Sequence, residues 1–248
     1  FESDNAFFLW LANNTVLRGL FPRLLSRQKF ADRRVLLTPL IQKLSGAFCA
    51  LGGEGTPLFV IDSHPVHVCK LVRSKFHTRL EGLAATGYCA SLKEYFHGVR
   101  EHLIFTPQGR IAFVLSIPGN RHDVIGLYAL LKTPFKGALL GDSAYQPRRS
   151  KEKQLRVQGI RVHAEQKSNA KQPRADHFRK WLHARRSKIE RRIGLFGKQF
   201  HARHTLNRSV RHYHARRWTK ALAHNCSRHI NVARHLAHES VAHFHAAA

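Results

Sequence analysis

The chain has 248 residues, of which 43% are hydrophobic, and it carries a formal net charge of +27 at pH 7. A chain of this length and apolar content can bury one sizeable core and a smaller appended part. So large an excess of positive charge argues against an enzyme of small anions. It is typical of a protein that neutralises many phosphates, so nucleic acid is the expected partner.

The sequence also disfavours membrane and disulfide-rich proteins. It has no run of 18 uncharged apolar residues, so no membrane partner is expected. Its cysteines lie far apart and form no C-x-x-C pair, which argues against a zinc ribbon or a disulfide framework and fits a reducing cytoplasm. Because methionine is absent even at position 1, the sequence is interpreted as a fragment or a trimmed product.

Residues 1–50 are predicted to be helical, because apolar side chains cluster at helical spacing around residues 17–25 and 36–44. A glycine-rich stretch at residues 52–57 interrupts this pattern. The chain is therefore predicted to contain a short helical module, residues 1–55, followed by a larger domain, residues 56–248.

Strands and helices are predicted to alternate in the second part. A short apolar run at residues 58–61 ends on Asp62, and the turn at residues 107–110 separates two runs in the manner of a hairpin. The predicted strands cover residues 58–61, 95–106, 111–117, 138–141 and 160–164. The predicted helices cover residues 123–131, 151–158, 176–200 and 215–236, and a polar linker with Lys167, Asn169, Lys171 and Pro173 precedes the third of them.

Positive charge is concentrated in residues 148–220, which hold 23 Lys and Arg against 4 Asp and Glu. A solvated tail would be the simplest explanation of such a block. However, Trp181, Ile189, Ile193 and Phe196 supply apolar surface that disordered tails usually lack, so a folded basic helix is predicted.

Three acids stand at the places where the elements of this pattern meet. Asp62 ends the first predicted strand, Asp142 directly follows the fourth, and Glu190 lies on the long basic helix. Each has a structural alternative: a strand-ending turn for Asp62, a helix cap for Asp142, and a surface ion pair with Arg186 for Glu190.

The residues around these acids resemble the motifs of bacterial insertion-sequence transposases with a DDE catalytic domain. The relevant stretches are I-D-S-H-P-V-H-V-C-K at residues 61–70, Y-C-A-S-L-K-E-Y-F-H-G-V at 88–99, P-G-N-R-H-D at 118–123, L-G-D-S-A-Y at 140–145 and R-R-S-K-I-E at 185–190. Each stretch alone is weak evidence for the family, whereas five of them in the order found in the family are a specific signal. Ser143 and Ala144 depart from the lysine and glycine of the family's fourth motif.

The resemblance implies an α/β fold of the ribonuclease H-like class, a mixed five-stranded sheet flanked by helices. It also implies a phosphodiester-cleaving and strand-transfer enzyme in which Asp62, Asp142 and Glu190 are both the catalytic residues and the metal ligands. Two Mg²⁺ (or Mn²⁺) ions would be held there, with Asp62 bridging them. Hard carboxylate oxygens are the ligands that these ions prefer.

Double-stranded DNA, as transposon ends and as target, is the implied partner. The bases expected to contact it lie on the long helix: Arg179, Lys180, Arg185, Arg186, Arg191, Arg192 and Lys198. In the family the helix shows tyrosine, arginine, glutamate and lysine on one face. Here His183 stands in place of tyrosine, and Lys198 comes one residue late, which turns its side chain by about 100°.

Ten of the 19 histidines occur from His201 onward, but their spacing repeats no zinc-finger pattern, so a helical surface that faces DNA is favoured over a metal site. Two rival functions stay open: a catalytically inactive DNA-binding relic of a transposase, and a cellular nuclease of the same fold. A homodimer is expected when two DNA ends are joined, and the expected location is the bacterial cytoplasm, in association with the nucleoid.

Overall fold

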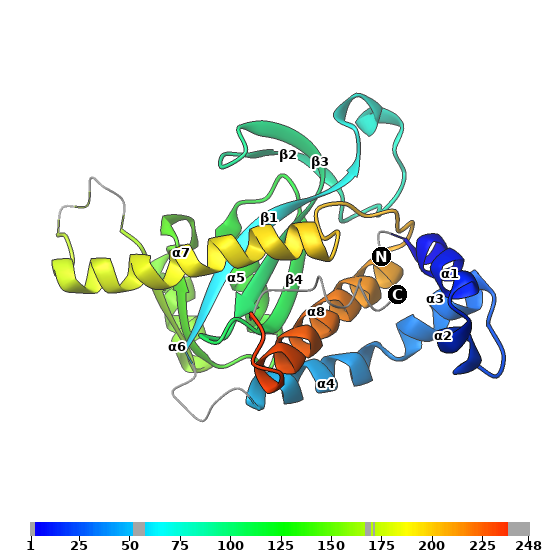
Figure 1. Ribbon diagram of the computed structural model, residues 1–248. Helices are drawn as coiled ribbons and strands as arrows, with labels where there is room; N and C mark the ends of the chain where they lie inside the picture. The colour runs from blue at the N-terminus through cyan, green and yellow to red at the C-terminus, as the bar shows by residue number, and fades with distance from the viewer. Residues whose placement is uncertain (1–2, 52–57, 167–169, 171, 238–248) are drawn as a thin grey trace.

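The computed structural model describes residues 3–51, 58–166, 170 and 172–237 (Figure 1). The glycine-rich break at residues 52–57 and the linker residues Lys167, Asn169 and Lys171 lie outside the described residues. The helices and strands in chain order are α1 (Asp4–Asn13), α2 (Thr15–Gly19), α3 (Arg27–Leu36), α4 (Thr38–Ala50), β1 (Leu58–Cys69), η1 (Leu71–Phe76), β2 (Ala85–Cys89), β3 (Glu94–Phe105), β4 (Ile111–Pro118), α5 (Asp123–Ala129), η2 (Leu130–Lys132), β5 (Gly137–Gly141), η3 (Ser143–Tyr145), α6 (Arg149–Val157), β6 (Ile160–Ala164), α7 (Asp176–Gln199) and α8 (Val210–Ala233).

The strands form one mixed sheet in the order β2-β3-β1-β5-β6, with β4 paired to β3. β3 is antiparallel to β1, β2 and β4, whereas β5 and β6 run parallel to β1. All five predicted strands are present, and β2 is a sixth that was not predicted. The mixed sheet with flanking helices confirms the expected α/β, ribonuclease H-like class.

β1 is much longer than its predicted four residues, which corrects the expectation that the strand ends on Asp62. It continues to Cys69 because β3 pairs with it along nearly its whole length. Its pairing with β5 stops at Val60, so the far half of β1 has β3 as its paired strand. Pro65, which lacks an amide hydrogen, is tolerated at such an edge position.

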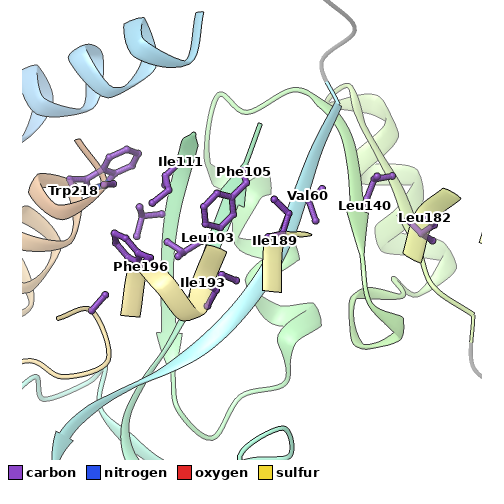
Figure 2. Packing of buried hydrophobic residues seen from close by; sticks show 13 residues of the cluster. Val60, Leu103, Phe105, Ile111, Leu140, Leu182, Ile189, Ile193, Phe196 and Trp218 are labelled. Carbon is purple, nitrogen blue, oxygen red and sulfur yellow. The ribbon is translucent and has the colours of Figure 1, made fainter. Parts of the chain in front are cut away.

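Helices cover both faces of the sheet, and each face has its own core. One core joins Val60, Leu103 and Leu140 of the strands to Ile189 of α7 and Trp218 of α8, as Figure 2 shows. The other core places Ile61 and Leu139 against side chains of α5, α6 and their neighbouring loops. Successive strand residues point to opposite faces, so the side chains of Val60 and Ile61 belong to different cores.

The N-terminal helices pack on α8 rather than on the middle of the sheet (Figure 1). The side-chain amide of Asn225 in α8 donates to Ser45 Oγ of α4 at 2.9 Å, and its oxygen accepts from the Ile111 amide at 2.8 Å. The Asp4 carboxylate of α1 pairs with Arg34 of α3 and with Arg216 of α8. None of the helices in the described ranges has the length and apolar character needed to cross a bilayer.

Candidate active site

Three neighbouring parallel strands place one acid each at the same level of the sheet. Val60 of β1 is in register with Leu140 of β5, which is in turn in register with His163 of β6. Two residues further along the three chains stand Asp62, Asp142 and Glu165. Because side chains alternate and neighbouring strands lie about 4.8 Å apart, this register brings the three carboxylates onto the face covered by α7.

Helix α7 brings a fourth acid and a base to this row. The Arg186 guanidinium contacts the Glu165 carboxylate, and it donates to Glu190 Oε1 at 3.0 Å. The helix is held in this place by its buried apolar stripe, which includes Leu182, Ile189 and Ile193. Arg186 and Glu190 are thus positioned by the packing of their own helix on the sheet.

The environment of Asp62 disfavours a negative charge. Burial raises the pKa of its carboxyl to about 7, the charges of Asp142 and Glu190 act in the same direction, and the Ser63 amide and Arg186 oppose the rise. Asp142 and Glu190 therefore lie close enough to Asp62 to repel a negative charge on its carboxylate. A bound cation would relieve that repulsion.

Asp142 shares this electrostatic environment. Burial raises its pKa, Arg186 lowers it, and the carboxylates of Asp123 and Glu165 raise it further. Asp142 also accepts a hydrogen bond from the Ala144 amide at 3.0 Å, so it caps η3, as its structural alternative predicts. Capping leaves its second carboxylate oxygen for another partner.

The structure brings the three predicted acids together as neighbours without clustering them as tightly as a closed metal site. Within the ranges that the structure describes, the one group of three or more metal-ligating side chains with ligand atoms all within 4.8 Å of one another is Cys69, His77 and His97. The donors of the acidic row are carboxylate oxygens, which suit Mg²⁺ or Mn²⁺ rather than softer metals. With Asp142 and Glu190 close enough to Asp62 to raise the pKa of its carboxyl, this donor set fits a divalent cation.

Arg186 occupies a different place from the one expected of a DNA phosphate contact. Only 8% of the residue is exposed, and its guanidinium is engaged by Glu165 and Glu190. Arg192 also turns inward in part, with a hydrogen bond of 3.3 Å to the Pro107 carbonyl in the β3–β4 turn. Both bases therefore contact other parts of the protein instead of projecting freely from α7.

The other predicted DNA contacts of α7 are exposed. Arg185 lies over the Trp181 ring at 4.2 Å, and Lys180 forms a surface ion pair of 2.8 Å with Asp176. An open cleft beside the acidic row is lined by Glu165 and by the bases Arg174, Arg179 and Lys180, among others. The exposed members of the predicted set are Arg179, Lys180, Arg185, Arg191 and Lys198.

Sequence reasoning missed Glu165 and Asp123. Glu165 directly follows β6 as Asp142 follows β5, and its amide donates to the Gly141 carbonyl at 2.9 Å. Its position after the last strand was the available signal. Asp123 begins α5, accepts from Ser63 Oγ at 2.6 Å and pairs with Arg100 at 3.6 Å.

Two histidines of the C-terminal part serve the packing of the protein. His224 is buried, and its ring bonds to the Gly109 carbonyl at 3.0 Å, while His212 lies between Ser209 and Asp32. The expectation of a DNA-facing histidine surface is therefore wrong for these two. Trp218 is a core residue at 6% exposure, in agreement with its apolar character.

The comparisons with known proteins agree with this geometry. A family model described as Transposase DDE domain matches residues 52–210, a span that contains Asp62, Asp142 and Glu190. The chain shows no significant similarity to the curated proteins or to the solved structures with which it was compared. A domain of this kind implies a nucleotidyl-transfer enzyme acting on DNA, and the family generally uses divalent metal ions. The chain belongs to the transposase DDE domain family.

Proposed function

We propose that this transposase cleaves DNA at the ends of a bacterial insertion sequence and transfers the cut strands to target DNA. Asp62, Asp142 and Glu190 would be its catalytic acids and metal ligands. The observation that carries the proposal is the row of carboxylates on β1 and directly after β5 and β6, faced by Glu190 from α7. Two Mg²⁺ (or Mn²⁺) ions bound there would stabilise the entering and leaving oxygens of the phosphodiester exchange.

The protonation of Asp62 gives the site its own pH dependence. A carboxyl must be ionised to ligate a cation, and the raised pKa of Asp62, about 7, puts its ionisation near neutral pH. Arg186 holds Glu190 and Glu165 in place, because one guanidinium contacts both carboxylates. We assign Arg186 this positioning role instead of the phosphate contact expected from sequence.

The exposed bases of α7 supply the DNA-binding surface of the proposal. Arg179 and Lys180 line the cleft beside Glu165, so a phosphate backbone bound there lies next to the acidic row. Arg185 combines its charge with the flat face of Trp181. Lys and Arg at such positions fix the register of DNA without reading its sequence.

The assembly follows from the same reaction. Joining two DNA ends in one event calls for two active sites, so we expect a homodimer on DNA, at the bacterial nucleoid. The division into a helical module, residues 1–55, and a catalytic domain, residues 56–248, is part of the same proposal, with the contacts of α4 on α8 linking the two.

A cleavage assay on inverted-repeat DNA with Mg²⁺ or Mn²⁺ tests the proposal. Asp62→Asn and Glu190→Gln should each lower the cleavage rate by orders of magnitude and leave DNA affinity intact, because the acids hold metal and the bases hold DNA. Glu152→Gln is the matched control, since Glu152 is a helical carboxylate in an i,i+4 pair with Arg156 of 2.8 Å, as Glu190 is with Arg186. It should cleave as the unmodified chain does.

The same assay separates the proposal from its rivals. An unmodified chain that binds DNA but cleaves nothing with either metal would favour the inactive relic. Cleavage without preference for the inverted repeats and without strand transfer would favour a cellular nuclease. Full activity of Asp62→Asn would overturn the assignment of the acids.

A further inference from the structure

A cluster of metal-ligating side chains lies at the opposite end of β1 from the acidic site. Cys69 is the last residue of β1, His97 is its partner across the ladder on β3, and His77 follows η1. Asp62 and Cys69 are about 23 Å apart along the strand, at about 3.3 Å per residue. The cluster therefore belongs to neither the acidic row nor the basic face of α7.

The ligand atoms of these three side chains are almost in coordination range of a common centre. One ligand atom each from Cys69, His77 and His97 lies within 4.8 Å of the other two. In a tetrahedral zinc site, bonds of about 2.3 Å to sulfur and about 2.0 to 2.1 Å to nitrogen separate the ligand atoms by about 3.3 to 3.6 Å. Side-chain rotations that move each atom by about 1 Å would close the difference.

Hydrogen bonds already orient the two imidazole rings. Thr86 Oγ1 of β2 lies 3.0 Å from His97 Nδ1, so a proton on Nδ1 directs the lone pair of His97 to Nε2. A partner of this kind on the second ring nitrogen is the usual companion of a metal-bound histidine. The Arg79 amide donates to His77 Nδ1 at 3.3 Å, a long bond that a cation could replace.

Nearby charges and burial shift the pKa of the Cys69 thiol in opposite directions. Partial burial raises the pKa of the Cys69 thiol, whereas Arg79 and Arg73 lower it. Burial likewise lowers the pKa of His97 and of His77, which favours the neutral rings that bind metals. The ligand group itself consists of one thiol and two imidazoles.

We propose that Cys69, His77 and His97 form a transition-metal site of the zinc class that fastens the η1 connection to the sheet. One thiolate and two neutral imidazoles suit Zn²⁺ and reject Mg²⁺, which prefers oxygen. Three protein ligands leave a fourth position for water. On binding, the thiol proton passes to solvent as the metal–sulfur bond forms.

The site would order a segment that presents unusual surface. Within η1, Val72 and Phe76 are 84% and 87% exposed. Arg73 and Lys75 of the same helix, and Lys70 just before it, add positive charge around them. A cation bound between β1, β3 and His77 ties both ends of this segment to strands. Zn²⁺ should therefore protect residues 70–79 from proteolysis.

Metal titration of the full chain after chelator treatment tests the proposal. Co²⁺ should bind with the charge-transfer absorption of a cobalt–thiolate bond, and Zn²⁺, measured by competition with a chromophoric chelator, should displace it at one equivalent. Cys69→Ser should abolish the thiolate band. Cys226→Ser, which removes another partly buried free thiol far away on α8, should keep it.

Two further variants keep the test decisive if Cys69→Ser fails to fold. His77→Gln changes a partly exposed side chain outside the strands and should weaken Zn²⁺ binding more than Thr86→Val does. Thr86→Val removes only an outer partner, so we expect a loss of about 10- to 100-fold. Absence of the cobalt–thiolate band in the unmodified chain, or its persistence in Cys69→Ser, would overturn the proposal. Neither result bears on Mg²⁺ at the acidic row, which has no sulfur ligand.

Discussion

At the scale of single residues, the site is defined by a half-buried carboxyl that lies near other carboxyls. Asp62 belongs to a core strand and points to the same face as Val60, so its charge is poorly hydrated. Asp142 and Glu190 add like charge. An acid in such a place is costly for folding and useful for binding a cation, as is common at functional sites.

The first prediction concerns stability and pH in the presence of a chelator. The pKa of Asp62 is about 7 in the folded state, against an ordinary value of 3.8, so between these values the folded state binds the extra proton and stability falls as pH rises. Asp62→Asn lacks this titration. Its free energy of unfolding should therefore exceed that of the unmodified chain by more at about pH 8 than at about pH 5.

Denaturant unfolding at the two pH values measures this difference. Glu152→Gln, which alters an acid on the surface helix α6, is the control and should show no such pH dependence. A constant difference between Asp62→Asn and the unmodified chain across this range would contradict the burial argument. Added Mg²⁺ should restore stability to the unmodified chain at about pH 8 and do little for Asp62→Asn.

Individual residues were predictable to an unequal degree. The three acids could be chosen because each lies in a stretch that resembles a motif of the family, and Asp62 and Asp142 also follow short apolar runs. The inward position of Arg186 could not be predicted, because it depends on contact with Glu165 at the end of β6. A contact between two elements separated by a linker has no signature in local spacing.

At the scale of elements, β3 and α8 are joined by a buried ion pair. Arg217 of α8 contacts both carboxylate oxygens of Glu101, and both side chains are almost fully buried. The Tyr213 hydroxyl donates to the same carboxylate at 3.3 Å. His64 of β1 lies 3.4 Å from the Glu101 carboxylate, so this network contacts the strand that carries Asp62.

The second prediction follows from the cost of an unpaired buried charge. Glu101→Gln should destabilise the protein by about 3 to 5 kcal/mol, because it leaves the Arg217 guanidinium without its counter-ion. Replacing both residues with apolar ones of similar volume should cost less than Glu101→Gln alone. Thermal or denaturant unfolding measures both variants, and a mild effect of Glu101→Gln would show that the pair is hydrated.

The elements themselves were largely predictable from the sequence, and their pairing was not. The apolar run at residues 138–141 corresponds closely to β5, because a buried parallel strand is a short continuous apolar segment. The predicted strand at residues 160–164 corresponds to β6, in which the apolar residues Ile160, Val162 and Ala164 alternate with Arg161 and His163. The far half of β1 and all of β2 were missed. Many residues of these two segments are polar, and the first segment contains Pro65, so neither has the pattern of a strand. They form strands because β3 provides hydrogen-bonding partners for both.

At the scale of the whole molecule, acidic and basic side chains occupy separate, adjacent parts of the protein. Asp62, Asp142, Glu165 and Glu190 gather in the site, and the exposed bases of α7 lie beside it. In the proposed function, this arrangement would separate metal binding by the acids from DNA binding by the bases. It also predicts that affinity for DNA depends steeply on salt.

The third prediction identifies which basic side chains contribute to DNA binding. Replacing Arg179 and Arg185 of α7 with Gln should reduce the slope of log affinity against log salt by about 0.9 for each phosphate that is no longer neutralised. The matched control replaces Lys132 and Lys136, which are exposed near the start of β5, at the opposite end of that strand from Asp142. Equal changes in slope for the two double variants would show that DNA binding follows total charge and not the α7 face.

The most direct measurement is anomalous diffraction from crystals of the unmodified chain soaked in Mn²⁺. The account predicts manganese peaks between the carboxylates of Asp62 and Asp142, with Glu190 turned from Arg186 to the ion, and no such peaks in crystals of Asp142→Asn. Manganese bound elsewhere, with Glu190 still paired to Arg186 and nothing beside Asp62, would contradict the assignment of these acids as the metal site.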